Sequence, residues 1–177
     1  MSLELIIGCM FSGKSTELIR RLKRYRAINK KILVINSSKD IRNSEQVLQT
    51  HDKVIFNCVK TNNLLEVLCT QEFSQSEIIG IDEAQFFTHL KDFVQGALLQ
   101  NKHVIVAGLD GDYRQEMFGE ILYLIPLADE VDKQKALCME CNDGTLGPFT
   151  KRIIQCETQE LVGANDLYKA VCRKHLT

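Results

Sequence analysis

Short apolar runs alternate with segments of helical periodicity along roughly the first 130 residues of the chain. Runs rich in Val, Ile and Leu indicate buried strands, whereas apolar residues three or four positions apart indicate helices. Regular alternation of the two predicts an α/β fold, with a parallel sheet covered by helices on both faces. The strands are expected at 5–7, 31–37, 53–59, 77–82 and 103–110, and the helices at 15–27, 62–70 and 86–100.

The pattern changes at about residue 135, where paired cysteines, glycines and a proline replace the long apolar runs. We therefore expect two domains, with residues 1–134 forming the α/β domain and residues 135–177 a small second domain. Within the second, IIQCETQELVGAND (153–166) is interpreted as a hairpin that turns near Glu157 and Thr158. A unit of this length is too short to build a core of its own.

A phosphate-binding loop is predicted directly after the first strand. Four residues separate Gly8 from Gly13, Lys14 and Ser15, which is the spacing of a P-loop. Glycines let backbone N–H groups approach phosphate oxygens, the lysine reaches the β- and γ-phosphates of ATP, and the serine hydroxyl holds Mg²⁺. An ordinary glycine turn is the alternative, but strand, loop and helix follow in the order that a P-loop needs. The expected ATP-binding residues are Gly8, Cys9, Met10, Phe11, Ser12, Gly13, Lys14, Ser15 and Thr16.

Two acidic residues, Asp82 and Glu83, follow the apolar run IIGI. A carboxylate at the end of a strand is the usual partner of a P-loop, because Mg²⁺ needs an anchored anion, and Asp82 is the candidate. Glu83 could take the proton of an acceptor hydroxyl as general base. The alternative is that both residues cap the next helix. DEAQ also resembles the DEA-x box of RNA helicases, but the chain has no room for the second RecA-like domain that they need.

Two pairs of candidate metal ligands lie in the C-terminal unit. Two residues separate Cys138 from Cys141, and two separate Cys172 from His175. Three thiolates and an imidazole make a closed tetrahedral Zn²⁺ site, hence a structural one, which would pin both ends of the glycine-rich segment. Free cytosolic thiols are the alternative. Cys156 lies outside this spacing and is predicted to be a free thiol.

Charge and composition restrict the partners of the chain. A net charge of −1 argues against nucleic acid as the main partner, and the basic run at 20–26 is interpreted as a solvated helix face. No apolar run approaches the roughly 20 residues that span a bilayer, so we expect no membrane segment. The start carries Glu4 and no basic leader, so no signal peptide is expected. Seven cysteines without such a signal indicate a reducing, cytoplasmic compartment.

Several motifs stand in a particular order along the chain: GCMFSGKSTEL, KDIR with THD, IDEAQFF, GLDGDY with FG, the two ligand pairs, and TKR with VGANDLY. Together they resemble the type II thymidine kinases, the family of cytosolic cellular, bacterial and poxviral enzymes, over nearly the whole chain. The resemblance implies a RecA-like P-loop domain and a zinc-ribbon or lasso domain that closes over the nucleoside. It implies transfer of the ATP γ-phosphate to the 5′-hydroxyl of thymidine or deoxyuridine, for DNA precursor salvage. Cys9 departs from the proline more common in the family, and His175 from a cysteine.

The resemblance also implies roles for single residues. Glu83 would be the base, and Arg42 would neutralise charge on the transferring phosphoryl group. Ser15, Asp40 and Asp82 would hold the Mg²⁺ that accompanies ATP. A homotetramer and feedback inhibition by thymidine triphosphate are further implications. The residues implied to bind the nucleoside are Met10, Phe86, Leu109, Tyr113, Phe118, Thr150, Leu161, Val162, Gly163 and Tyr168.

Two other classes of protein fit the P-loop and the cysteine pairs. One is a nucleic-acid-dependent P-loop ATPase that grips its partner with a zinc ribbon, and it predicts ATP turnover stimulated by DNA or RNA. The other is a non-catalytic nucleotide-binding zinc module, which predicts ATP binding without phosphoryl transfer. The fate of the γ-phosphate of ATP distinguishes these two classes from each other and from a thymidine kinase.

Overall fold

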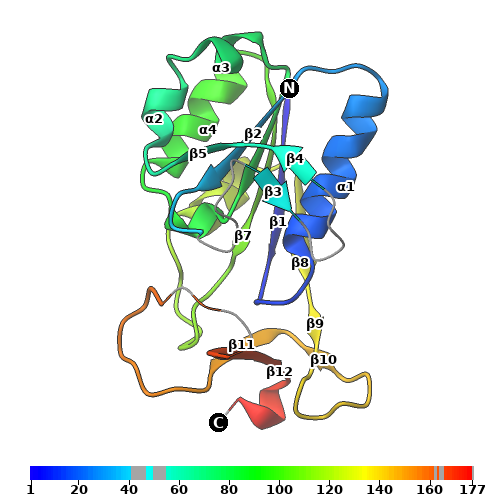
Figure 1. The fold of residues 1–177 in the computed structure, drawn as a ribbon, viewed down its shortest axis with the longest axis vertical. Coiled ribbons are helices and arrows are strands. Elements are labelled where there is room, and N and C mark those ends of the chain that lie inside the picture. Colours follow the sequence, from blue (N-terminus) through cyan, green and yellow to red (C-terminus); the bar gives the residue numbers. More distant parts are fainter. Residues whose placement is uncertain (41–46, 50–54, 162, 164–165, 177) are drawn as a thin grey trace.

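The computed structural model describes residues 1–40, 47–49, 55–161, 163 and 166–176. Figure 1 shows a central sheet with helices on either side and the C-terminal unit below it. Within the described residues, six strands form this sheet in the order β5-β2-β6-β7-β1-β8, and every neighbouring pair is parallel. The predicted α/β fold with a parallel sheet is therefore confirmed. The strands are β1 (Ser2–Gly8), β2 (Ile32–Ser37), β5 (Val59–Thr61), β6 (Ile78–Asp82), β7 (His103–Leu109) and β8 (Glu130–Gln134).

Helices cover the two faces of the sheet, α1 on one side and α2, α3 and α4 on the other (Figure 1). Leu18 and Leu22 of α1 pack into one buried apolar cluster with Ile105 of β7. Phe73 and Phe93 belong to the larger cluster on the opposite face, where their rings meet edge to face at 5.7 Å. None of the helices in the described part has the length and apolar character needed to cross a membrane. The helices are α1 (Lys14–Ala27), α2 (Leu64–Val67), α3 (Gln71–Gln75) and α4 (Leu90–Leu99).

The helix predicted at 62–70 is two short helices, because Thr70 interrupts it. The Thr70 side chain accepts a hydrogen bond from the Phe73 N–H and so begins α3 as its N-cap. The helix predicted at 86–100 starts later, with α4 at Leu90, after the 3₁₀ turn η1 (Ala84–Phe86). A second 3₁₀ segment, η2 (Ile121–Leu127), had no counterpart among the predictions.

The strands differ from the prediction at two places. The apolar run at 53–59 contains two strands: β4 (Ile55–Asn57), which pairs antiparallel with β3 (Val47–Gln49) outside the main sheet, and the start of β5. Residues 53 and 54 lie outside the described residues. β8 was not predicted, because EVDKQ holds a single apolar residue; this edge strand forms through its pairing with β1.

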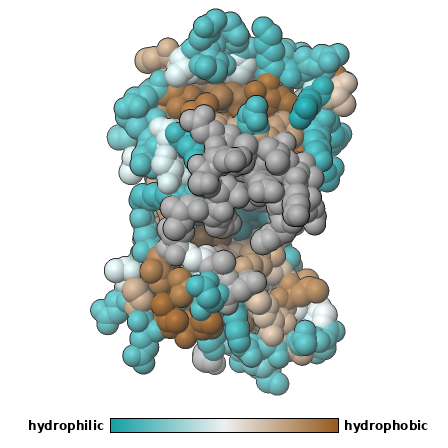
Figure 2. Space-filling view, in the orientation of Figure 1, coloured by the Kyte–Doolittle hydropathy of each residue, from teal (hydrophilic) through white to brown (hydrophobic). Residues whose placement is uncertain are grey.

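The C-terminal unit holds two small antiparallel pairs, β9 (Ala136–Leu137) with β10 (Leu146–Gly147) and β11 (Phe149–Arg152) with β12 (Tyr168–Val171). A 3₁₀ turn, η3 (Arg173–His175), follows. The predicted hairpin within 153–166 is wrong in its strands, since residues 153–161 form none and β11 and β12 bracket them. Several apolar residues of the unit are exposed, and Figure 2 shows apolar atoms gathered on it. The division into domains at residue 135 stays a prediction.

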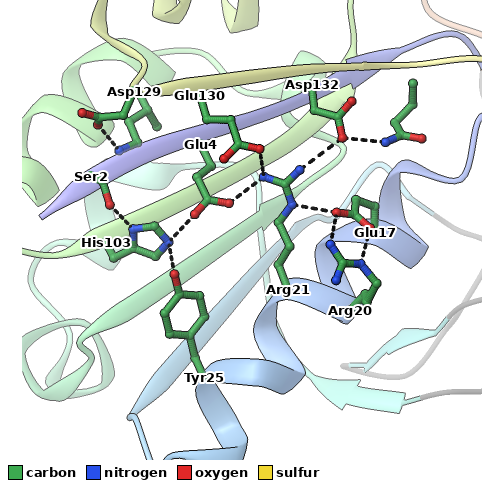
Figure 3. A network of polar contacts seen from close by, with 12 residues as sticks. Ser2, Glu4, Glu17, Arg20, Arg21, Tyr25, His103, Asp129, Glu130 and Asp132 are labelled. Atoms are coloured by element: carbon green, nitrogen blue, oxygen red, sulfur yellow. Dashed lines mark hydrogen bonds and ion pairs between the residues drawn. The ribbon is translucent and has the colours of Figure 1, made fainter.

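The basic run on α1 is not only a solvated face, because Arg21 is buried. Figure 3 shows its guanidinium among carboxylates from α1, β1 and β8. Arg21 donates to Glu17 at 2.8 Å, Glu4 at 2.6 Å and Asp132 at 3.1 Å. Although burial opposes it, hydrogen bonds to Glu17 and Glu4 raise the pKa of Arg21 above its ordinary value. The arginine thereby connects α1 with β1 and with the edge strand β8.

Candidate active site

A tight loop, residues 9–13, connects β1 to α1. Gly8 has a φ of +147°, and a Cβ there would lie 2.3 Å from the carbonyl oxygen of Gln134. Gly13, with a φ of +85°, is the N-cap of α1 and places no capping side chain over its first turn. The N–H groups of that turn, at the positive end of the helix dipole, thus remain for a ligand. This is the geometry of a phosphate cradle.

The half-buried lysine of this loop lies close to several carboxylates. The Lys14 ammonium donates to the carbonyl oxygen of Cys9 at 2.6 Å. Burial lowers the pKa of Lys14, and the charge of Glu83 opposes this most strongly, with smaller contributions from Asp82 and Asp110. The loop lysine and the acidic pair predicted to work with it therefore lie within electrostatic reach of one another.

Glu83 adopts a left-handed backbone conformation, with φ 50° and ψ 41°. Its carboxylate oxygen Oε2 accepts a hydrogen bond of 2.6 Å from the Gln85 amide, whose own oxygen accepts from the Leu109 N–H at 2.9 Å. Gln85 is buried, so this bridge links the end of β6 to the end of β7. Glu83 does not cap the following turn with its side chain, contrary to the alternative interpretation of the acidic pair.

Two further carboxylates lie at the carboxyl ends of neighbouring strands. Asp82 ends β6 and pairs in register with Asn36 of β2. The Asn36 amide donates to the Oδ2 of Asp40 at 3.0 Å, just beyond the end of β2. Both aspartates are buried. Arg42, predicted to act at this edge, lies outside the described residues.

The C-terminal unit contacts the phosphate loop directly. The Met10 N–H donates to the Thr150 hydroxyl at 3.0 Å, and the Cys9 thiol donates to the Gly147 carbonyl at 3.2 Å. Thr150 and Met10, both predicted to bind a nucleoside, are thus neighbours. The rings of Phe86, in η1, and Phe118 were both predicted to bind the nucleoside, and they meet edge to face with their centres 5.6 Å apart.

Two tyrosines hold the segment that follows β11. The Tyr113 hydroxyl donates to the carbonyl oxygens of Cys156 and Glu157, each at 3.3 Å. The Tyr168 hydroxyl donates to the Leu161 carbonyl at 2.7 Å. Gly163 packs against Leu167, where a Cβ would lie 2.1 Å from a side-chain carbon. Val162, also predicted to bind substrate, lies outside the described residues.

The four predicted metal ligands converge in the C-terminal unit. All ligand atoms of Cys138, Cys141, Cys172 and His175 lie within 4.8 Å of one another. The Cys141 and Cys172 sulfurs are 3.7 Å apart, and the His175 Nδ1 is 3.4 Å from the first and 3.5 Å from the second. A tetrahedron with Zn–S bonds of about 2.3 Å has edges of roughly 3.8 Å, so the cluster fits Zn²⁺. The backbone N–H groups of Cys141 and Cys172 also point at the Cys138 sulfur, as they do around thiolates.

Known proteins identify the family. A family model described as thymidine kinase matches residues 1–176. The thymidine kinase of Vaccinia virus (strain Western Reserve) is 43% identical over 172 residues, which cover 97% of this chain and 94% of the viral protein. The chain belongs to the thymidine kinase family. The thymidine kinases of Myxoma virus (strain Uriarra), at 44%, and Sheeppox virus (strain KS-1), at 42%, match with the same coverage.

The fold is shared more widely than the family. The crystal structure of flagellar accessory protein FlaH from Methanocaldococcus jannaschii matches with a TM-score of 0.50 and 15% identity, covering 82% of this chain and 74% of that one. At this identity the likeness concerns the fold alone. Membership in the thymidine kinase family makes the chain a kinase and does not favour the nucleic-acid-dependent ATPase.

Three residues that the sequence analysis did not name make hydrogen bonds with residues in or beside the candidate site. Gln85 holds Glu83, and Arg152 contacts the segment after β11. Asp112 is buried, and its Oδ2 accepts a hydrogen bond of 2.9 Å from Gln159. Each lies in one of the motifs that carry the family resemblance, IDEAQFF, TKR or GLDGDY, and these motifs are the sequence feature that could have pointed to the three residues. Their partners lie far along the chain, so the contacts themselves were not predictable.

Proposed function

We propose that this chain is an ATP-dependent thymidine kinase, which transfers the γ-phosphate of ATP to the 5′-hydroxyl of thymidine or deoxyuridine. The observation that carries the proposal is the position of Lys14 and Glu83, which follow the carboxyl ends of β1 and β6, the two strands on either side of β7 in the parallel sheet. A phosphate-binding cation and a candidate base are gathered at one place, and phosphoryl transfer to a hydroxyl needs both. Family membership supports the choice of substrate.

The phosphate loop would hold the triphosphate of ATP. Backbone N–H groups of residues 8–16 surround phosphate oxygens, and Lys14 neutralises charge on the β- and γ-phosphates. The Ser15 hydroxyl and the carboxylates of Asp40 and Asp82 offer the oxygen ligands that Mg²⁺ prefers. When bound, Mg²⁺ would supply positive charge that offsets the negative charge of the phosphates.

Glu83 would accept the proton of the 5′-hydroxyl as the hydroxyl oxygen attacks the γ-phosphorus. The Gln85 amide, 2.6 Å from one carboxylate oxygen, restricts the rotation of the Glu83 side chain. A base held in one orientation lowers the barrier, because less freedom is lost on the way to the transition state. Arg42 remains assigned to the charge of the transferring phosphoryl group by resemblance to the family.

The nucleoside would bind between the carboxyl edge of the sheet and the segment 150–163. Phe86 and Phe118 offer an apolar wall from one side, and Tyr113 and Tyr168 hold the segment on the other. Backbone groups of residues 161–163 would bind the edge of the base. A buried site of this kind rejects analogues that leave its polar groups without a hydrogen bond.

Zn²⁺ would have a structural role, because four protein ligands leave no open position for substrate. The buried apolar cluster near the metal ligands contains Ala136 and Ala170 but is completed by Cys9 of the phosphate loop. The unit thus has little core of its own, and we expect its fold to depend on the metal. A homotetramer, inhibition by thymidine triphosphate and a cytoplasmic location stay predictions from the family resemblance.

One assay tests the proposed function against its rivals. The purified chain is incubated with γ-labelled ATP, Mg²⁺ and thymidine, and the products are separated. Label on the nucleoside is the expected result. Label released as inorganic phosphate only when DNA or RNA is added would instead identify a nucleic-acid-dependent ATPase. ATP that binds but stays intact would identify a non-catalytic module.

A further inference from the structure

Arg152, the last residue of β11, has its guanidinium buried at the base of the segment 153–161. It is 9% exposed and stands opposite Tyr168 in the β11–β12 register. One terminal nitrogen donates to the carbonyl oxygens of Cys156 at 2.8 Å and Thr158 at 2.6 Å. The other donates to the carbonyl oxygen of Gln159 at 3.0 Å and to the Tyr168 hydroxyl at 2.7 Å.

Aromatic rings complete the surroundings of this cation. The guanidinium carbon of Arg152 lies 3.8 Å from the centre of the Tyr113 ring and 5.2 Å from that of Tyr168. Within the described residues no carboxylate forms an ion pair with Arg152. Its positive charge is instead stabilised by hydrogen bonds to backbone carbonyls and by the π faces of the tyrosine rings. Lysine could not replace it, because a point charge with three donors matches neither the planar stack nor four acceptors.

The segment 153–161 has no strand or helix of its own, so side chains determine its path. Arg152 captures three of its carbonyls, and Gln159 reaches Asp112 at 2.9 Å. Arg152 is also linked to Leu161 through Tyr168. The Tyr168 hydroxyl accepts a hydrogen bond from Arg152 and donates one to the Leu161 carbonyl. One buried cation therefore connects the fold of the segment with the backbone expected to bind the base.

We infer that Arg152 is a positioning residue of the nucleoside site, which folds the segment 153–161 onto Tyr113 and, through Tyr168, places Leu161. The identity of the substrate in this inference rests on the proposed function, whereas the role of Arg152 in folding the segment 153–161 does not. Within the described residues, the hydrogen bonds of Arg152 go to the segment 153–161 and to Tyr168 and none reaches the phosphate loop, so ATP binding should not depend on it. Its loss should weaken binding of thymidine and not that of ATP.

Cys156 provides a reporter of the segment that needs no substrate. The hydrogen bond from Thr158, and more weakly the charge of Arg152, lowers the pKa of the Cys156 thiol. Removing the charge alone would therefore slow alkylation, since the thiolate is the reactive form. Faster alkylation in an Arg152 variant can only report an opened segment.

The experiment compares Arg152→Met, Arg152→Lys and the control Arg114→Met. Arg114 also donates to this segment, at the Glu157 carbonyl 2.6 Å away, but its side chain is exposed. Alkylation of Cys156, read by peptide mass, should be about tenfold faster or more in Arg152→Met, intermediate in Arg152→Lys, and within about threefold of wild type in the control. The KM for thymidine should rise about tenfold in Arg152→Met, with kcat and the KM for ATP changed by less than about threefold.

Each outcome decides the inference. Unchanged alkylation in both Arg152 variants would overturn it, whether or not the chain phosphorylates thymidine. Faster alkylation with an unchanged KM for thymidine would overturn it too, because Arg152 would then be only a structural residue of the segment. Zinc content verifies the fold of each variant. If Arg152→Met loses its zinc, the alkylation rate of Cys156 and the KM for thymidine in Arg152→Lys decide the inference instead. A wild-type chain that labels no nucleoside refutes the proposed function, and the alkylation rates still judge the role of Arg152 in the segment.

Discussion

At the scale of single residues, Glu83 combines a left-handed backbone with a carboxylate held by a buried amide. Such a conformation costs of order 1–3 kcal/mol in a residue other than glycine, and residues of this kind concentrate at functional sites. The position of Glu83 could be predicted, because the apolar run IIGI ends just before the acidic pair Asp82 and Glu83. Its partnership with Gln85 could not, since Gln85 is oriented by Leu109, 24 positions further along the chain.

Replacing Glu83 tests its role as the base. Glu83→Gln keeps the size of the side chain but removes its capacity to accept a proton, so turnover should fall about 100-fold or more. ATP binding, measured by calorimetry, should remain. Glu72→Gln, on the exposed face of α3, is the control and should keep wild-type turnover. Near-normal turnover in Glu83→Gln would exclude it as the base.

At the scale of elements, apolar patterns predicted what is buried and missed what forms at the edges. The run 103–110 is almost uniformly apolar and became β7, buried between β6 and β1. The strand β8 carries three charged residues and a single apolar one, and it forms because β1 offers it a free edge. The hairpin predicted for 153–166 is wrong over residues 153–161, because the path of this segment depends on Arg152 and Tyr113 and not on a pattern of its own.

The attachment of α1 to the sheet gives a prediction about stability. Arg21→Met should lower the free energy of unfolding by about 3 kcal/mol, because the carboxylates of Glu4 and Glu17 would lose their buried counter-charge. Arg20→Met is the matched control: Arg20 also pairs with Glu17 but is exposed, and this variant should unfold close to wild type. Urea unfolding measures both. Equal losses would mean that burial of Arg21 does not matter.

The segment 153–161 should respond to substrate. If it closes over the nucleoside, thymidine should slow alkylation of Cys156, which lies half-buried on this segment. ATP alone should change the rate far less, since the phosphate loop binds it elsewhere. Equal rates with and without thymidine would remove the claim that this segment closes over substrate. The exposed Cys69 serves as an internal control in the same digest.

At the scale of the whole molecule, the C-terminal unit contains the metal cluster and also contacts the phosphate loop. Ligand spacing in the sequence sufficed to predict the cluster, because two residues separate the ligands of each pair, which places both on one side of a turn. The order of strands in the sheet was not predictable to the same degree, since it depends on contacts between distant segments. The hydrogen bonds from Met10 to Thr150 and from Cys9 to Gly147 join the units at the phosphate loop.

Removal of the metal tests how far the smaller unit depends on it. Elemental analysis should find one Zn²⁺ per chain, and Cys172→Ser should make the C-terminal unit sensitive to protease before the P-loop domain unfolds. Cys69→Ser, outside the cluster, is the control and should behave as wild type. A metal-free protein that is fully folded and active would refute the site.

The central claim, transfer of phosphate to the 5′-oxygen of thymidine, is tested most directly by the identity of the product. The chain is given ATP, Mg²⁺ and either thymidine or 5′-deoxythymidine, which lacks the acceptor hydroxyl, and the products are examined by phosphorus NMR and mass spectrometry. The account predicts thymidine 5′-monophosphate, formed in equal amount to ADP, and no phosphorylated product from 5′-deoxythymidine. ADP formed without a phosphorylated nucleoside, or phosphate found on the 3′-oxygen, would contradict it.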